Sequence, residues 1–408
     1  MAYTQKVFDK INVFDLIKEF GSPLYVYDEE TLRLRCREMR NLMKYPSFRV
    51  NYSAKANTNV ELLKIIRSED LDVDAMSPGE MYLELKAGYT PDRITFIGNN
   101  VSREEMQFAV KRGIYTSVDS LSQLALLGEV NPGGEVCLRI NPGIGAGHHE
   151  KVVTGGKKAK FGIAIEDLPR AQEIAAGYQL TITGLNQHIG SLFLETEEYV
   201  AAAAQMLELA AQFPSVKIVD FGGGMGIPYD HVSEPRLDLE KLGRELDDLV
   251  QNWVKKNRPI AIKIEPGRYV VAECGAILGT VTAVKHNYNT DFVGCDIGFN
   301  TLIRPAMYDS YHEISAVPAQ TRAYAEYEGC VYLVGQICES GDILAHDRVL
   351  PVCREGDGII VHDAGAYGFS MASGYNSRPL PAEVLIQCDG QVRLIRKGQT
   401  LEELWPDD

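Results

Sequence analysis

Between about residues 30 and 275, short β-branched or apolar runs alternate with stretches in which apolar residues recur at helical spacing. The strand-like runs are residues 48–55, 71–77, 94–99, 115–120, 135–143, 182–190, 217–224 and 261–269. The helical stretches include residues 61–68, 79–88, 103–113, 199–213 and 239–256. Repeated strand–helix units are typical of α/β proteins. Eight such units favour a (β/α)8 TIM-type barrel over a doubly wound open sheet, which usually has fewer strands.

After about residue 275 the helical pattern fades and strand-like runs dominate. These runs are residues 276–287, 291–298, 322–335, 357–365 and 382–397. The extended run at 23–28 precedes the first helical stretch and can join the same sheet. The sequence therefore predicts a barrel over residues 29–275, and an all-β domain, a sandwich or Greek-key barrel, formed by residues 1–28 and 276–408.

Composition narrows the functional classes. The chain has 408 residues, 45% of them hydrophobic and 24% charged, and its hydrophobic runs are far shorter than the ~20 residues of a membrane span. A net charge of −15 repels nucleic acid. The eight cysteines form no C-x-x-C pair, so neither a metal site nor a disulfide framework is predicted. Asp9 and Asp15 interrupt the N-terminal segment, which lacks a signal-peptide pattern, and we expect a cytoplasmic protein with no membrane or nucleic-acid partner.

Unusual residues fall at the carboxyl ends of the predicted strands, where active sites of such barrels lie. Lys55 ends the first strand-like run and could form a Schiff base with a carbonyl compound. The alternative is a lysine that only extends toward solvent. His188 and Ser191 lie at the end of the sixth run, where an imidazole could lie against a planar ring and a hydroxyl could reach a phosphate, although a structural histidine is the commoner case.

Two further strand ends carry candidate chemistry. The run Gly222-Gly223-Gly224-Met225-Gly226 offers backbone amides that can approach a phosphate closely, but lacks the spacing of a dinucleotide site. Glu265-Pro266-Gly267-Arg268 places a carboxylate and a guanidinium within four residues. A buried glutamate could keep a pyridine nitrogen protonated, whereas a structural Glu–Arg ion pair is the alternative.

These residues belong to motifs that span nearly the whole chain. They are YSAKAN at 52–57, NPGIGAGHHEKVVTGG at 141–156, KFGI at 160–163, HIGS at 188–191, GGGMGIPY at 222–229, EPGR at 265–268, IRPAMYDSYH at 303–312, CESGD at 338–342 and GAYGFSMASGYNSRP at 365–379. With them the chain resembles the fold type III pyridoxal-phosphate-dependent decarboxylases, and most closely the branch that acts on diaminopimelate. The lysine, HIGS, GGG and EPGR motifs imply the cofactor, pyridoxal 5'-phosphate, while the 141–156 loop, RPAMY and CESGD imply the substrate.

The resemblance implies a role for each motif residue. It makes Lys55, His188 and Cys338 catalytic, with Lys55 bonded to the cofactor and His188 stacked on its ring. Cofactor-binding residues would be Lys55, His188, Ser191, Gly223, Gly224, Glu265, Pro266, Gly267, Arg268 and Tyr375. Substrate-binding residues would be Arg268, Arg304, Tyr308, Glu339 and Tyr375. Cys338 and Glu339 would come from the partner subunit of a homodimer with shared active sites.

The chemistry of meso-2,6-diaminopimelate suits this set. Its distal amino-acid head requires a cation for the carboxylate and an anion for the ammonium, which Arg304 and Glu339 would supply. Arg304 could instead anchor a loop. After loss of carbon dioxide a proton must return to the substrate carbon, and Cys338 is the candidate acid, assisted by Lys55. The expected product is L-lysine.

Three alternatives stay open. A related decarboxylase could act on ornithine, lysine, carboxynorspermidine or a biosynthetic conjugate, but a substrate without the distal carboxylate would not need Arg304. A non-catalytic cofactor-binding relative would have lost Lys55 or Cys338, and both are present. An enzyme similar to alanine racemase would place a tyrosine base where this chain has Cys338-Glu339.

Overall fold

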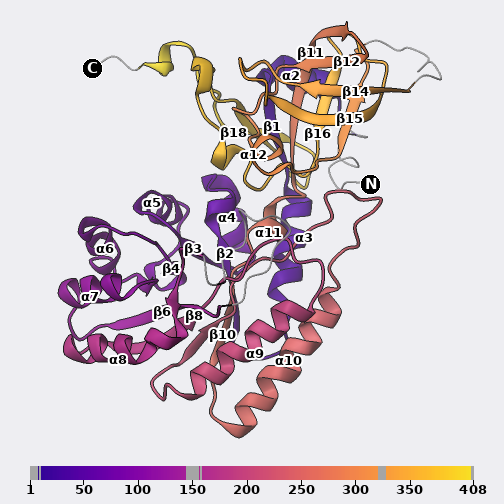
Figure 1. Ribbon diagram of the computed structural model, residues 1–408. Helices are drawn as coiled ribbons and strands as arrows, with labels where there is room; N and C mark the ends of the chain where they lie inside the picture. The colour runs from indigo at the N-terminus through magenta and orange to yellow at the C-terminus, as the bar shows by residue number, and fades with distance from the viewer. Residues whose placement is uncertain (1–7, 9–10, 144–155, 157–158, 320–327, 406–408) are drawn as a thin grey trace. The chain divides into compact units, whose positions relative to one another are not determined.

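The computed structural model describes residue 8, residues 11–143, residue 156, and residues 159–319 and 328–405. The chain divides into two compact units (Figure 1). One, the barrel unit, comprises Leu34–Ile227 and Arg236–Val270, and the other, the β unit, comprises Met1–Arg33, Pro228–Pro235 and Val271–Asp408. Most of the loop motif at 141–156 and the first part of the run at 322–335 lie outside the described residues.

The barrel unit contains a closed ring of eight parallel strands within the described residues. They are β2 (Phe48–Ser53), β3 (Asp72–Ala75), β4 (Ile94–Phe96), β5 (Tyr115–Val118), β6 (Glu135–Asn141), β8 (Thr181–Asn186), β9 (Ile218–Asp220) and β10 (Ala261–Ile264). The pairings of β5 with β6 and of β10 with β2 close the ring, and the two-residue β7 (Ile163–Ala164) attaches to β6. Each of the eight predicted runs overlaps one of these strands, so the barrel prediction is confirmed.

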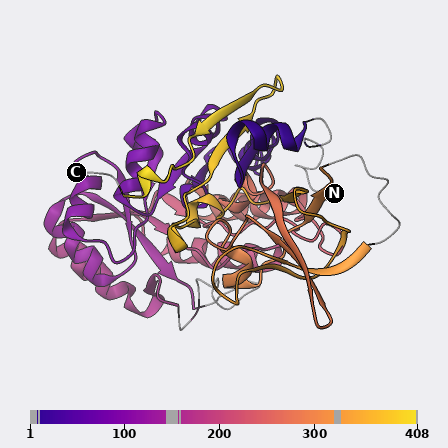
Figure 2. The same ribbon diagram turned by 90° about the horizontal axis from the view of Figure 1, so that it is seen from above.

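Helices cover the outside of this ring (Figure 1 and Figure 2). They are α3 (Glu29–Arg40), α4 (Val60–Ser68), α5 (Pro78–Lys86), α6 (Arg103–Val110), α7 (Leu121–Val130), α8 (Leu168–Gly177), α9 (Glu197–Ala211) and α10 (Leu239–Lys256). Local sequence explains where they start, since the Ser102 hydroxyl accepts from the Glu105 amide and the Glu105 carboxylate caps Ser102 in return. Helix α10 buries Leu242, Leu246 and Val250, which recur every four residues and form its apolar face.

The β unit is built on a nine-stranded sheet that mixes parallel and antiparallel pairs within the described residues. Its strands are β1 (Leu24–Asp28), β11 (Gly275–Asn287), β12 (Thr290–Cys295), β13 (Ile314–Val317), β14 (Glu328–Val334), β15 (Ile343–Pro351), β16 (Gly358–Val361), β17 (Ala382–Ile386) and β18 (Val392–Arg396). Strand β1 pairs with β11 and β17, so the run at 23–28 joins this sheet as expected.

Apolar residues and short helices complete the β unit. Leu24, Val26, Leu278 and Val384 pack in one core on the sheet. Two short helices, α2 (Val13–Phe20) and α12 (Arg304–Tyr308), belong to this unit, and α11 (Arg268–Val271) lies at the junction of the two units in the chain. None of the helices in the described part of the chain combines the length and apolar character needed to cross a bilayer.

Candidate active site

Expected cofactor residues lie at neighbouring strand ends on one rim of the barrel. Lys55 sits in a 3-10 turn, Ala54–Ala56, directly after β2, and Glu265 directly follows β10. The Ser53 amide donates to the Pro266 carbonyl at 3.1 Å, and the Glu265 amide donates to the Gly222 carbonyl at 3.0 Å. These bonds join the ends of β2, β10 and β9. The rim of the barrel therefore gathers side chains that are up to 210 positions apart in the chain.

His188 is partly buried and electrically neutral. Its Nδ1 accepts a hydrogen bond from the Gly223 amide at 3.3 Å, so the proton of the neutral ring is on Nε2. Burial, the Lys55 ammonium and the Arg139 guanidinium all lower the pKa of His188 well below its usual value. A flat, uncharged imidazole is suited to lie against the face of an aromatic ring.

The glycine run after β9 is required by close packing of the backbone. A Cβ on Gly223 would lie 2.0 Å from the Glu265 carbonyl oxygen, and one on Gly222 would lie 2.1 Å from the Gln187 carbonyl oxygen. Only residues without a side chain fit there. On the same rim, Arg268 is buried and its Nη2 donates to the Ser191 hydroxyl at 3.3 Å. Backbone amides, a hydroxyl and a guanidinium are the donors that a phosphate group accepts from.

Three of the buried carboxyl groups of the barrel unit act on one another electrostatically: Asp74, Asp220 and Glu265. Burial is the largest cause that raises the pKa of Asp74 to about 8 and that of Asp220 to about 6. The pKa of Glu265 is raised well above its usual value by burial and by the charges of Asp220 and Asp74, against the opposing effect of Lys55 and Arg139. Sequence reasoning missed Asp74 and Asp220, although each lies within one of the predicted strand runs.

This interior fits the cofactor that the motifs imply. Lys55 provides an amine, His188 provides a flat neutral ring, and the glycine turn provides amides. The carboxyl of Glu265 resists ionisation, as its raised pKa indicates, first because it is buried and second because two further acids lie around it. A protonated pyridine nitrogen would supply the positive charge that favours the ionised form of Glu265.

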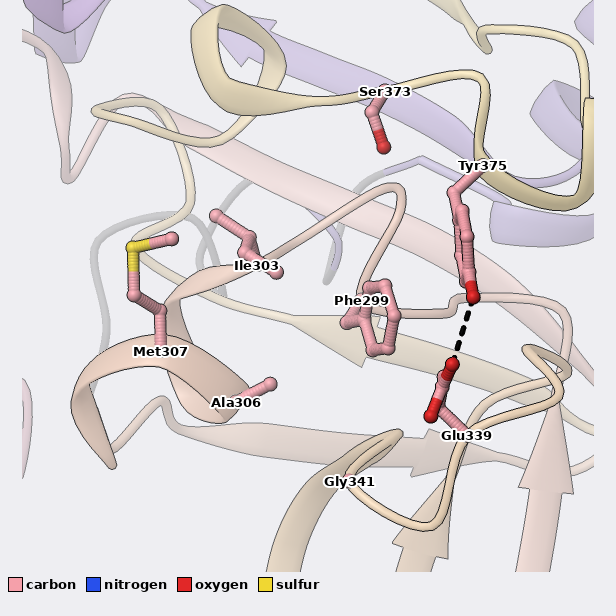
Figure 3. A pocket seen from close by; sticks show the side chains of 8 residues that line it. All are labelled: Phe299, Ile303, Ala306, Met307, Glu339, Gly341, Ser373 and Tyr375. Carbon is pink, nitrogen blue, oxygen red and sulfur yellow. Dashed lines mark hydrogen bonds between the residues drawn. The ribbon is translucent and has the colours of Figure 1, made fainter.

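The β unit carries a group of exposed residues that we call the 338–376 group: Cys338, Glu339, Tyr375 and Asn376. The Asn376 side chain donates to Cys338 Sγ at 3.1 Å and accepts from the Cys338 amide at 3.0 Å. The Tyr375 hydroxyl donates to Glu339 Oε1 at 2.7 Å (Figure 3). These two pairs hold Cys338 and Glu339 next to the 3-10 turn that begins at Tyr375.

A cavity of about 600 Å³ opens beside this group. Its lining side chains come from α12 and from the loops around it: Phe299, Ile303, Ala306, Met307, Glu339, Gly341, Ser373 and Tyr375 (Figure 3). The Tyr375 ring stacks on Phe299 with centroids 5.7 Å apart. Glu339 and Tyr375, expected to meet substrate, thus line one cavity together.

Arg304 and Tyr308 are the first and last residues of α12, and Arg304 is not among the residues that line the cavity. Arg304 is buried, and its Nη1 donates to His312 Nε2 at 2.8 Å. Tyr308 is partly buried. Sequence reasoning gave no role to His312, although it ends the quoted IRPAMYDSYH motif.

Comparison with known proteins gives first the class and then the branch. Residues 29–272 match the model of the pyridoxal-binding domain of pyridoxal-dependent decarboxylases. The diaminopimelate decarboxylase of Methanothermobacter thermautotrophicus is 41% identical over 96% of this chain and 92% of its own, and that of Escherichia coli K12 is 37% identical over 96% and 95%.

Solved structures give the same result. A crystal structure of diaminopimelate decarboxylase matches with a TM-score of 0.90 at 36% identity, covering 96% of this chain and 95% of its own. The Helicobacter pylori diaminopimelate decarboxylase, complexed with L-lysine, matches with a TM-score of 0.88 at 31% identity over 97% and 98% of the two chains. The chain belongs to the pyridoxal-dependent decarboxylases and, within them, to the diaminopimelate decarboxylase family.

Proposed function

We propose that the protein decarboxylates meso-2,6-diaminopimelate to L-lysine and carbon dioxide with pyridoxal phosphate as its cofactor. Relatives of this specificity align with about 96% of the chain. The observation that carries the proposal is the meeting of Lys55, His188, Gly223 and Glu265 at one end of the barrel. In the proposed division of labour, the barrel holds the cofactor and the β domain contributes substrate residues.

Within the barrel each residue has a defined task. Lys55 holds the cofactor covalently through its amine. His188 covers one face of the ring, and Glu265 pairs with the ring nitrogen. When bound, pyridoxal phosphate would supply a protonated ring as the sink for the electron pair released as the carboxylate leaves. The phosphate is held by Ser191 with the amides of Gly223 and Gly224, by the turn formed by Glu265, Pro266, Gly267 and Arg268, and by Tyr375.

The remaining residues bind the substrate and return a proton. Arg268, Arg304, Tyr308, Glu339 and Tyr375 contact the two amino-acid heads. Cys338 donates its thiol proton to the substrate carbon after decarboxylation, and Lys55 assists. The Asn376 amide donates to Cys338 Sγ at 3.1 Å and so fixes the position of the thiol.

Loss of the lysine tests the cofactor assignment. Lys55→Ala should abolish the visible absorbance of the cofactor–lysine linkage and lower kcat by about 10³-fold or more. Lys64→Ala is the control, since Lys64 lies on α4 of the same unit with its side chain half exposed and should leave that absorbance in place. An unchanged spectrum in Lys55→Ala would refute the assignment.

A substrate panel tests the specificity. Purified protein with pyridoxal phosphate should release carbon dioxide from meso-diaminopimelate. It should release much less from ornithine or lysine, because each of these has only one carboxylate and therefore none at the distal end. Faster release from either of those would favour the related decarboxylases instead.

A homodimer with shared active sites is the proposed assembly. Cys338, Glu339 and Tyr375 are exposed in the single chain, and an open cavity lies beside them. Subunits carrying Lys55→Ala and subunits carrying Cys338→Ala should regain activity when mixed, because a mixed dimer then holds one intact site. Mixed dimers that stay inactive would contradict the sharing.

The cytoplasm is the proposed compartment. All eight cysteines are free thiols, which suits a reducing environment, and five of them are buried: Cys36, Cys137, Cys274, Cys295 and Cys353.

A further inference from the structure

The buried guanidinium of Arg304 is held by aromatic residues of its own unit. Arg304 and His312 are 2% and 1% exposed, so the hydrogen bond between them is shielded from water. The guanidinium carbon lies 4.5 Å from the centre of the Tyr229 ring. The His312 ring meets the same tyrosine edge-on, with centroids 5.1 Å apart. His312 and Tyr229 therefore contact each other and the arginine.

The hydrogen bonds of His312 fix which of its nitrogens carries the proton. An arginine N–H can only donate, so Nε2 of His312 must be an unprotonated acceptor. Nδ1 then carries the proton and donates to the carbonyl oxygen of His362 at 2.8 Å. The imidazole is neutral in this state. It orients the guanidinium without cancelling its positive charge, whereas a carboxylate at the same place would cancel that charge.

The backbone around His312 is anchored on two strands. The His312 carbonyl accepts from Arg348 Nη1, on β15, at 2.9 Å. The next residue, Glu313, accepts through its carbonyl from the His362 amide at 2.9 Å, directly after β16. Asp309, with φ of 53°, turns the chain back after α12. His312 is thus a fixed point of the sheet placed against the side chain of Arg304.

We propose that His312 is a positioning residue that holds Arg304 in the orientation needed to pair with the carboxylate at the end of the substrate that is not decarboxylated. This inference rests on the proposed function. A guanidinium pairs with a carboxylate through two parallel hydrogen bonds only when its plane is correctly set. The neutral acceptor His312 Nε2 fixes one end of the Arg304 guanidinium and so sets its orientation. The positive charge of the guanidinium then remains available for the substrate.

Two ligands separate this role from a merely structural one. L-Lysine keeps the carboxylate that Arg304 would bind, whereas cadaverine, the diamine of the same chain length, has none. Both are to be measured as inhibitors of the pyridoxal-phosphate-loaded enzyme. His312→Phe keeps a ring against Tyr229 and removes the acceptor. This variant should weaken the binding of L-lysine about tenfold, the loss expected for one hydrogen bond to a charged group. The affinity for cadaverine should stay unchanged.

Two further variants control for shape and stability. His312→Gln keeps an acceptor near the position of Nε2 and should restore most of the L-lysine affinity. His362→Phe removes another fully buried histidine, whose Nε2 lies 2.9 Å from the Ser315 hydroxyl, and should leave the ratio of L-lysine to cadaverine affinity unchanged. A crystal structure of His312→Phe should show the Arg304 guanidinium displaced.

The outcomes are separable. An unmoved Arg304 in His312→Phe, an unchanged L-lysine affinity, or an equal loss for both ligands would overturn the positioning role. A wild-type enzyme that binds L-lysine no better than cadaverine would also overturn it. A wild-type enzyme that prefers L-lysine in a His312-dependent way but releases no carbon dioxide from diaminopimelate would refute the proposed reaction and support the positioning role.

Discussion

The barrel rim and the 338–376 group keep their polar residues in opposite environments. In the barrel, Asp74, Asp220 and Glu265 are buried, and burial raises the pKa of each. In the β unit, Cys338 and Tyr375 are exposed, and their side chains make hydrogen bonds with Asn376 and Glu339 at the surface. Interactions between charges are strong where water is excluded and weak where it is not. The barrel therefore organises its own site, whereas the exposed group needs another surface to exclude water from it.

Crowding the barrel rim should have the largest effect. Gly223→Ala would put a methyl group 2.0 Å from the Glu265 carbonyl oxygen, so the ends of β9 and β10 must separate. We expect a loss of stability of about 1–3 kcal/mol and severe loss of cofactor binding. Thermal unfolding and a spectroscopic cofactor titration measure the two effects.

The control for that variant is Gly177→Ala, at the end of α8 in the same unit. A Cβ there would meet no atom within 4 Å, so stability and cofactor binding should be kept. Equal behaviour of the two alanine variants would show that close packing at the rim is unimportant.

Replacing the buried glutamate should impair the reaction without unfolding the barrel. Glu265→Gln keeps the shape of the side chain but cannot stabilise a protonated ring nitrogen by charge. We expect kcat to fall by about 10²-fold or more, with KM changed far less. Steady-state kinetics on diaminopimelate checks this. A KM effect that exceeds the kcat effect would assign Glu265 to substrate binding instead.

Another buried acid of the barrel unit should make stability depend on pH. Glu84, on α5, is fully buried, neither of its carboxyl oxygens has a hydrogen-bond partner in the described part of the chain, and its pKa is raised to about 9, chiefly by burial. Between its unfolded pKa of about 4.3 and this value, the folded state holds a proton that the unfolded state has lost. Stability contributed by this group is therefore full below that unfolded pKa and falls as the pH rises toward 9.

Glu84→Gln removes that titration. The free energy of unfolding of the variant should match that of the wild type near pH 5 and exceed it increasingly toward pH 8, by up to about 1.4 kcal/mol per pH unit. Thermal unfolding measured across this range checks the sign. Glu208→Gln, exposed on α9, should follow the wild type at every pH. If Glu84→Gln instead became less stable relative to the wild type as the pH rises, Glu84 would not be protonated in the folded protein.

The same contrast between buried and exposed positions explains what the sequence could predict of the fold. The eight barrel strands were found because parallel strands, buried on both faces, form nearly continuous apolar runs. Strand β15 was missed because His346, Asp347 and Arg348 interrupt its apolar residues. In a sheet with one exposed face such charges are tolerated, and no simple run remains.

The site residues that the sequence predicts are those at the ends of strands. Lys55, His188 and Glu265 were proposed because they end strands, a rule that needs only the order of elements. Asp74 and Glu84 were missed because a carboxylate within a strand or helix is most often solvated. His312 lies eight positions from Arg304, and only the turn at Asp309 brings the two together.

The smallest effect is expected where the exposed group loses one hydrogen bond. Tyr375→Phe removes the bond to Glu339 but keeps the ring that stacks on Phe299. The unfolding midpoint of the isolated subunit should stay unchanged, since water replaces the lost partner at an exposed site. KM for diaminopimelate should rise by about two- to tenfold, because Glu339 then loses the group that orients it toward the substrate. Tyr288→Phe, at a tyrosine that is 97% exposed, is the control and should change neither quantity. A rise in KM far above tenfold, at unchanged subunit stability, would mean that the Tyr375 hydroxyl acts in a site from which water is excluded. The 338–376 group would then be as shielded from water as the barrel rim once the active site is assembled.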